Sequence, residues 1–342
     1  MAKPKTKAAM WTQYLAIRAV EMTLCMWPQQ SNMRFGAQVG RLFNLLDSKN
    51  RRRILYNLGF AMPHLTEQQR ITMSAQVTEN LVKLFMEILH SPRVLHPDSW
   101  GSLAMIQAPT IAPAVELLNQ RKPVIMVTGH FGNWEIMGTM MALMGYDMDA
   151  IARPFDNPLI YDWMVGIREK RGLRLITKWD ATDRMIDVLD GGGALAFIAD
   201  QNAGDRGIFV PFFGKLASSY KSIGLLAIQK NVPIVCGYAM RLNDQMRFEL
   251  GATDIIYPED WQSQSDPLYY VTARYMRAIE SMVRLAPEQY FWMHRRWKSR
   301  PRHERLNKPF PSGLRRSLDS LPWMTQEELD SLMQGLPQPT AY

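Results

Sequence analysis

The stretch VIMVTGHFGNWEIMG, residues 124–138, decides the fold because it joins an apolar run to a helical pattern through a glycine-rich turn. The run VIMVT is apolar and β-branched, which is typical of a buried strand. Gly129 and Gly132 mark the turn, and Asn133 is a suitable N-cap for the helix that follows. The stretch therefore predicts a strand followed directly by a helix, with His130 on the turn between them.

The same alternation continues on the C-terminal side of this stretch. Short apolar runs such as MDAIAR, LRLIT, ALAFIAD and VPIVCGYAM are separated by segments with helical spacing. Strands that alternate with helices of this length are usually joined by crossover connections, which place them in a largely parallel sheet covered on both faces. The predicted fold class is α/β, a largely parallel sheet flanked by helices.

The N-terminal stretch AAMWTQYLAIRAVEMTLCMW, residues 8–27, is apolar but is interrupted by Arg18 and Glu21. A helix that lies in or partly enters a membrane is favoured over a full span, and the alternative is a helix packed on the protein's own core. We expect three regions: a membrane-associated helix over 1–30, the main α/β domain over 31–308, and a loose C-terminal tail with one short helix over 309–342.

Composition narrows the partners. The 342 residues include 40 Lys and Arg against 32 Asp and Glu, a formal net charge of +8, which suits an anionic membrane surface, an acidic carrier protein or nucleic acid. Nucleic acid is disfavoured because no recognition motif or zinc-ligand spacing accompanies the basic residues. Cys25 and Cys236 lie far apart in apolar stretches, so neither a disulfide framework nor a cysteine metal site is predicted. We expect no metal and no cofactor, and nothing in the sequence indicates the oligomeric state.

His130 and Glu135 form the predicted catalytic pair. In one continuous helix a separation of five residues would put them about 140° apart around the axis, so they could not meet. If the chain bends at the turn and the helix starts near Asn133, Glu135 lies in the first turn and can face the imidazole. A carboxylate there could hold one ring nitrogen while the other accepts a proton from a hydroxyl. The alternative is a loop histidine beside an ordinary glutamate at a helix N-terminus.

Five segments carry a family resemblance: GHFGNWE, ARPFDNPLIYDW, ADQN, GIFVPFFGKLAS and PEQYFWMHRRWKSRP. In this order they resemble the bacterial lipid A biosynthesis acyltransferases, the lauroyl and myristoyl transferases of the wider lysophospholipid acyltransferase group. The resemblance covers roughly residues 10 to 303. It implies transfer of an acyl group from acyl carrier protein, or a related donor, to a hydroxyl of a membrane glycolipid such as a lipid A precursor. It places that reaction at the cytoplasmic face of the inner membrane and matches His130 and Glu135 to the family's H-x-x-x-x-E pair.

Further residues are predicted to bind substrate. Arg153 and Asp200 each follow an apolar strand, and ligands of open α/β sheets bind at the carboxyl ends of strands. Arg153 could hold an acceptor phosphate or the donor's phosphopantetheine, or stabilise the thioester oxyanion, the alternative being a surface ion pair. Asp200 is either a site residue or a structural anchor of its loop. The full predicted substrate-binding set is Gly132, Asn133, Arg153, Asp200, Gln201, Arg295, Arg296 and Lys298.

Two basic clusters, Arg51–Arg53 and the HRRWKSR segment over 294–300, are either solvated surface or contacts for anionic lipid or an acidic carrier. The segment GIFVPFFG is either buried packing or a wall of an acyl pocket. Neither G-x-S-x-G nor H-E-x-x-H occurs, which argues against a serine hydrolase and a zinc hydrolase. A membrane-associated binding or scaffold protein without turnover remains an alternative, as does transfer of an aminoacyl group or transfer to a lipid other than lipid A.

Overall fold

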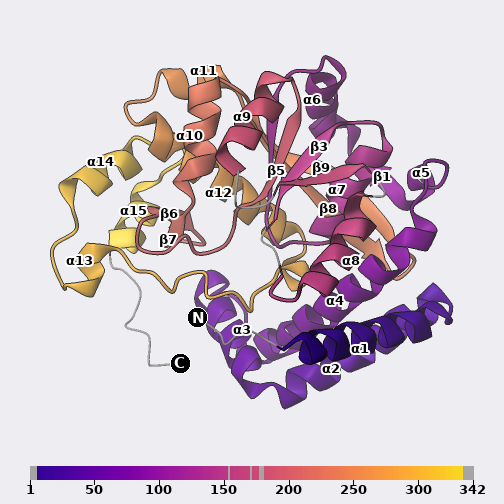
Figure 1. Cartoon of the computed structure of the whole chain (residues 1–342). Coiled ribbons are helices and arrows are strands. Elements are labelled where there is room, and N and C mark those ends of the chain that lie inside the picture. The colour runs from indigo at the N-terminus through magenta and orange to yellow at the C-terminus, as the bar shows by residue number, and fades with distance from the viewer. Residues whose placement is uncertain (1–5, 153–154, 170–171, 177–180, 334–342) are drawn as a thin grey trace.

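The computed structural model describes residues 6–333 except 153–154, 170–171 and 177–180. Within these residues a seven-stranded sheet forms the centre (Figure 1), in the order β1-β9-β8-β2-β5-β3-β4. The strands are β1 (Ala104–Ile106), β2 (Val124–Thr128), β3 (Met148–Ile151), β4 (Leu173–Ile176), β5 (Ala194–Ile198), β8 (Ile234–Asn243) and β9 (Arg247–Ile256). Only the β8–β9 pair is antiparallel in this sheet. The predicted largely parallel sheet is confirmed.

Strand β2 shows why helices cover both faces of the sheet. Val124 and Met126 lie in one apolar cluster, and Ile125 and Val127, whose side chains alternate with theirs, lie in another. The first cluster includes residues of α6 (Ala108–Asn119) and α7 (Trp134–Leu143), and the second includes residues of α9 (Ala181–Asp190), α10 (Lys221–Lys230) and α12 (Pro267–Leu285). A strand buried on both sides needs no polar face, which explains the uninterrupted apolar run in the sequence.

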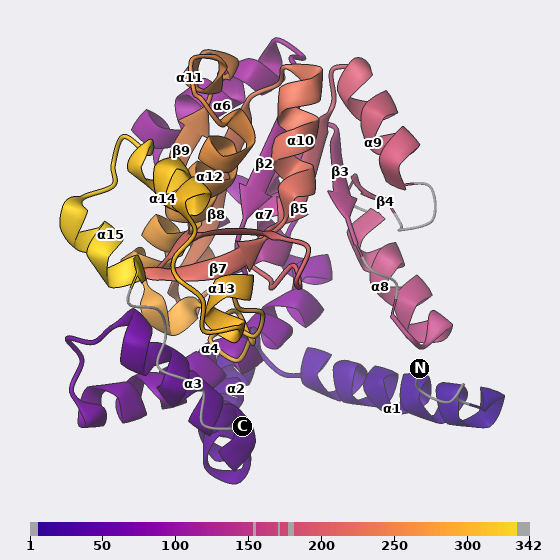
Figure 2. The same cartoon turned by 90° about the vertical axis from the view of Figure 1, so that its left-hand side faces the viewer.

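Four N-terminal helices pack together at one end of the molecule (Figure 2): α1 (Lys7–Cys25), α2 (Gln29–Leu46), α3 (Ser48–Ala61) and α4 (Glu67–Val94). Helix α4 begins with a capping box, since Thr66 and Gln69 each accept from the other's backbone N–H. Helix α1 reaches α8 (Pro158–Glu169), where Arg18 lies 5.4 Å from the ring centre of Trp163. Among the described residues, no helix has both the length and the apolar character that a membrane span requires.

The C-terminal stretch is attached to the main domain. Leu318, Leu321, Leu329 and Leu332 are at most 2 % exposed and belong to the same apolar cluster as α12. Leu318 lies in α14 (Ser312–Asp319), Leu329 and Leu332 lie in α15 (Gln326–Met333), and Leu321 lies between the two helices, whereas we expected one short helix on a loose tail. The remaining elements are α5 (Trp100–Leu103), β6 (Ile208–Phe212), β7 (Lys215–Ser219), α11 (Pro258–Gln262), a 3₁₀ turn (Pro287–Gln289) and α13 (Arg302–Arg305).

A buried ion pair fixes the position of α4 against the sheet. Glu87 of α4 accepts two hydrogen bonds from Arg241 of β8, and neither side chain is more than 4 % exposed. Glu87 also accepts from the side chain of Asn133, which caps α7, at 2.8 Å. The pair therefore holds the start of α7 in place through α4.

We expect Glu87→Ala to lower the free energy of unfolding by about 3 kcal/mol, because it leaves the Arg241 guanidinium buried without its counter-ion. Urea unfolding would measure this change. Glu79→Ala is the control, since its partner Arg41 is 57 % exposed and such pairs contribute less than about 1 kcal/mol. Equal losses in the two variants would show that the buried pair has no special role.

Candidate functional site

The predicted strand-to-helix turn is present between β2 and α7, and its backbone is tightly held. Gly132 has φ +58°, and a Cβ there would lie 2.1 Å from the carbonyl oxygen of Ala239, so only glycine fits. Asn133 caps α7 as predicted, because its side chain accepts from the N–H of Ile136 at 3.0 Å. The N–H of Phe291 donates to the carbonyl of His130 at 3.0 Å. Since each of these contacts restrains the turn, the backbone of His130 is held in one position.

Asp200, at the end of the strand neighbouring β2, holds the His130 side chain. Its Oδ1 lies 2.6 Å from His130 Nδ1, and its Oδ2 accepts the backbone N–H of His130 at 2.9 Å. Asp200 is fully buried and the His130 side chain is 14 % exposed. Burial alone would raise the pKa of Asp200, but the charge and hydrogen bonds of His130 together with His294 hold that pKa well below its usual range. The pair thus consists of an ionised carboxylate and an imidazole whose Nε2 is left for chemistry.

Aromatic side chains restrict the His130 ring further. The ring centre lies 4.9 Å from that of Trp134 and 4.6 Å from that of His294, both in edge-to-face geometry. Burial lowers the pKa of His294 to about 4, so this second imidazole is neutral at pH 7 and adds no charge beside His130. Gln201 Nε2 lies 3.5 Å from His130 Nε2, on the side away from Asp200.

Glu135 lies in the first turn of α7, as predicted, but its carboxylate is engaged by Arg168 of α8. The two nitrogens Nε and Nη2 of Arg168 donate to its two oxygens at 2.9 and 2.8 Å. The side chains are 15 % (Arg168) and 21 % (Glu135) exposed. The contact with His130 that we expected of Glu135 is made by Asp200 instead, and Glu135 connects α7 to α8.

The other predicted site residues fall into four groups. Gln201 is beside His130, and Arg295 and Lys298 are exposed. Asn133 and Arg296 are 0 % and 1 % exposed, and their polar groups bond to the protein's own interior, so neither faces a substrate in this structure. The prediction for Arg153 lies outside the described residues. Sequence reasoning missed Arg168, which lies in no quoted motif, and it quoted His294 within HRRWKSR without singling it out as a neighbour of His130.

The segment GIFVPFFG is packing. It forms β6 and the turn to β7, an antiparallel hairpin, and Val210, Phe212 and Phe213 are at most 3 % exposed in the main core. The guanidinium of Arg296 stacks over Phe212 and its Nη2 donates to Ser219 Oγ at 2.6 Å. The second serine of the Ser218–Ser219 pair thus anchors this buried arginine.

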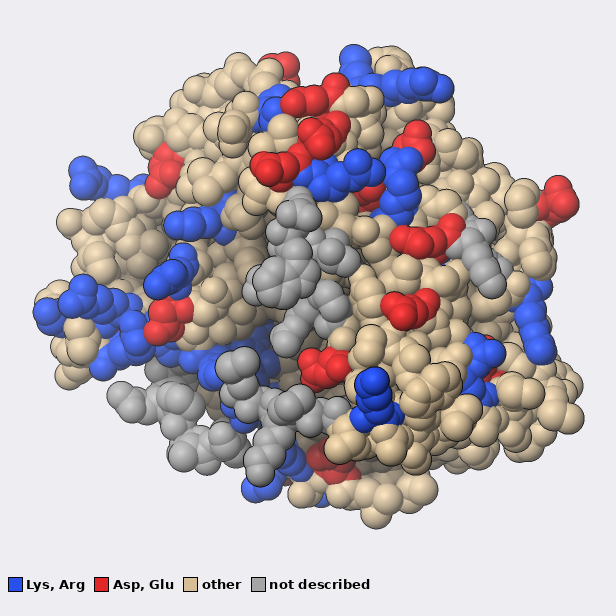
Figure 3. Space-filling view, viewed as in Figure 1, with Lys and Arg blue, Asp and Glu red and all other residues tan. Residues whose placement is uncertain are grey.

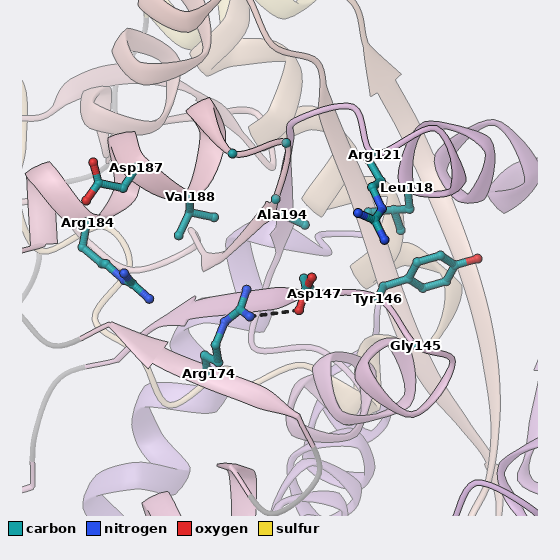
Figure 4. Close-up of a pocket in the computed structure, with 13 residues that line it drawn as sticks. Leu118, Arg121, Gly145, Tyr146, Asp147, Arg174, Arg184, Asp187, Val188 and Ala194 are labelled. Carbon is teal, nitrogen blue, oxygen red and sulfur yellow. Dashed lines mark hydrogen bonds and ion pairs between the residues drawn. The ribbon is translucent and has the colours of Figure 1, made fainter.

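Two cavities help to locate the reaction. One of about 320 Å³ is lined by Tyr146, Arg174, Arg184 and their neighbours (Figure 4). It opens at the amino ends of β3, β4 and β5, the edge of the sheet away from His130, and Arg174 is already paired with Asp147 and Asp149. A smaller apolar recess of about 80 Å³ is lined by Thr128, Gly138, Leu173, Ala196 and the Glu135–Arg168 pair. Of these two cavities, the recess borders the site.

The site thus combines a buried carboxylate, a histidine oriented by it and an adjacent apolar recess, an arrangement that is chemically suited to proton transfer beside an apolar group. The family model described as bacterial lipid A biosynthesis acyltransferase matches residues 2–299. The chain belongs to this family, and it is an acyltransferase.

Its curated relatives are named for the same group. It is 24% identical over 294 residues to the lipid A biosynthesis lauroyltransferase of Escherichia coli strain K12, covering 85% of this chain and 92% of the relative. It is 24% identical over 303 residues to the myristoyltransferase of that strain, covering 85% and 88%. A third relative there, the palmitoleoyltransferase, is 29% identical over 187 residues, covering 53% and 58%.

Proposed function

We propose that this protein transfers an acyl group from a carrier-protein thioester to a hydroxyl of a membrane glycolipid of the lipid A precursor class. The observation that carries the proposal is the His130–Asp200 pair at the carboxyl end of β2, with a 2.6 Å contact on Nδ1 and an Nε2 whose neighbour is Gln201 Nε2 at 3.5 Å. An imidazole held on one nitrogen by an ionised carboxylate is a suitable general base at its other nitrogen.

The chemistry needs one base and no covalent acyl-enzyme. His130 Nε2 takes the proton of the acceptor hydroxyl while the hydroxyl oxygen forms the new C–O bond to the carbonyl carbon of the thioester. The C–S bond then breaks. The imidazolium returns its proton to the sulfur, so that the carrier leaves as a free thiol. Asp200 stabilises the imidazolium between these two steps, because its buried negative charge lies against the ring.

The exposed apolar residues of the N-terminal helices support the proposal that the acceptor is a membrane lipid. Large apolar side chains are exposed on both α1 and α2, and the most exposed include Met22, Leu45 and Leu46, at 63 to 74 %. Such a face is costly in water and is typical of a helix that lies in the bilayer interface. We propose that α1 and α2 rest on the inner membrane, at its cytoplasmic face.

The test is a reaction with defined components. Purified protein, an acylated carrier protein and a lipid A precursor in mixed micelles should give a lipid whose mass has increased by one acyl group. Mass spectrometry of lipids from cells with and without the protein would then identify the group, whether fatty acyl or aminoacyl, and the acceptor. No added mass in either experiment would favour a binding protein without turnover.

We expect Glu135 to act through Arg168. Glu135→Gln and Arg168→Gln should each lower transfer by about ten- to a hundredfold, because misplacement of α7 against α8 by about 1 Å is enough for such a loss. The double variant should be no worse than either single variant, since both changes break one ion pair. Steady-state rates with saturating donor would measure this. Losses that multiply in the double variant would contradict it.

A further inference from the structure

The excess positive charge of the chain is concentrated in one short segment. Residues 295–316 contain nine Lys and Arg residues against one acidic residue, Glu304, a surplus of eight. The formal net charge of all 342 residues is also +8, so the rest of the chain is neutral on balance. A charge distributed in this way points to a local function of the segment and not to general solubility.

The fold brings this segment beside the other basic cluster of the sequence. Asn57 of α3 donates to the carbonyl oxygens of Trp292 and His294 at 2.7 and 3.0 Å. Arg53 of the same helix donates to the carbonyl of Met293, and burial together with the charge of Arg295 lowers the pKa of Arg53. Figure 3 shows Lys and Arg side chains gathered over the surface where α13 lies and continuing towards α3.

Six exposed residues define what we call the basic strip: Arg52, Arg295, Lys298, Arg302, Lys308 and Arg316. None of them has a carboxylate partner among the described residues of the chain. No described carboxylate therefore neutralises these charges, which makes them suitable contacts for an anionic partner.

The basic strip leads to the catalytic histidine. It follows the loop after β5, where Asn202 donates to Ser299 Oγ at 3.2 Å and Arg305 pairs with Asp205 at 3.2 Å. Gln201, near the start of that loop, has its Nε2 3.5 Å from His130 Nε2. A partner held along the strip would thus present a flexible prosthetic arm to His130.

The basic strip differs from a bilayer-binding face. A face that enters a bilayer combines basic residues with large exposed apolar ones, and those are concentrated on α1 and α2. Over residues 295–316 the exposed large apolar residue is Leu306. Figure 2 shows α1 projecting away from the side of the molecule where α13, α14 and α15 lie. The strip is therefore suited to a soluble anionic partner, while the lipid surface meets α1 and α2.

We propose that the basic strip is the docking surface of the acidic carrier protein that delivers the acyl thioester, which rests on the function proposed above. The carrier's acidic face lies along α13, α14 and the 295–300 segment, and its arm reaches His130 past Gln201. Donor and acceptor then approach from different sides, so the carrier can leave without displacing the protein from the membrane.

The test compares two triple variants of the full chain with equal changes in charge. The strip variant is Arg302→Gln, Lys308→Gln, Arg316→Gln, and the control is Arg121→Gln, Lys122→Gln, Arg184→Gln, three exposed residues around the amino ends of the strands. Binding of labelled acyl carrier protein is measured by fluorescence anisotropy across salt concentrations, without any turnover. Transfer is measured separately with dodecanoyl carrier protein and with dodecanoyl pantetheine, which lacks the protein.

We expect the strip variant to bind the carrier about tenfold more weakly, because three exposed charge contacts are lost, and the control to bind it normally. The difference should shrink as salt rises, since charges are screened within about 10 Å at 0.1 M. Transfer from dodecanoyl pantetheine should be unchanged in both variants. Equal weakening in the two variants would overturn the proposal. It would also be overturned if the strip variant kept its binding to the carrier but lost binding to phosphatidylglycerol vesicles, measured by co-sedimentation. If the original protein transferred the acyl group from neither donor, the proposed function would be refuted. The anisotropy measurement would still test docking in that case.

Discussion

His130→Ala should reduce acyl transfer by about 10² to 10⁴, roughly 3 to 5 kcal/mol of transition-state stabilisation. In the proposed mechanism this side chain supplies the nitrogen that takes the acceptor's proton. The turn should keep its backbone contacts, such as Phe291 N–H to the His130 carbonyl, but the variant should be less stable, because the buried Asp200 carboxylate loses its imidazole partner. Circular dichroism at the assay temperature shows whether the variant is folded. Initial rates at saturating donor and acceptor measure the loss.

His64 provides the matched control, since it is an exposed histidine in the turn before α4. His64→Ala should keep the rate within about twofold of the original, because removal of an exposed loop side chain rarely changes structure. A folded His130→Ala protein with near-normal turnover would exclude His130 as the base. The family assignment would still hold in that case, and the search for the base would move to other groups near Gln201.

Local sequence patterns were sufficient for the sheet and for the turn that carries His130. An apolar run such as VIMVT leaves no polar face, so the covered parallel sheet follows from burial alone. The N-cap of α7 follows from the type of residue, because an Asn side chain at that position accepts a backbone N–H. Gly132 follows from its conformation, which other residues rarely adopt.

The partner of His130 could not be predicted in this way. Glu135 is the nearest carboxylate along the chain, and its place in the first turn of the helix led us to expect that it faces the ring. Asp200 is 70 residues away and reaches His130 only because β5 pairs with β2, a neighbour relation that periodicity does not reveal. The strand order of a parallel sheet depends on how its crossovers pack, so the two ends that meet are set by tertiary structure.

Sequence patterns also do not predict which basic side chains are buried. Arg295, Arg296 and Lys298 look alike in the sequence, yet Arg296 is buried and the other two are exposed. The difference arises because Ser218 and Ser219 of the β6–β7 hairpin accept from the Arg296 guanidinium. Long-range acceptors of this kind decide whether a basic side chain is a surface group or an internal anchor.

Asp200→Asn should lower transfer by about 10³, although the side chain keeps its size. An asparagine cannot stabilise the imidazolium, and its amide can hold the ring in a tautomer that presents N–H at Nε2 instead of a lone pair. Because the pKa of Asp200 lies well below its usual range, the carboxylate stays ionised and the loss should persist from about pH 5 to 9. Rates over that range with saturating substrates would check this. Asp190→Asn, a change at an exposed carboxylate paired with Lys230, is the control and should have little effect.

Double variants separate the roles of the two carboxylates. If Asp200 acts through the imidazole, adding Asp200→Asn to His130→Ala should cause almost no further loss, because both changes remove one proton transfer. Glu135→Gln, which acts through the position of α8, should instead multiply the loss of Asp200→Asn, since different contacts are broken. The reverse pattern, with Glu135 coupled to His130 and Asp200 independent of it, would show that the working enzyme exchanges the two carboxylates at Nδ1. Asp200 would then be only a structural anchor of its loop.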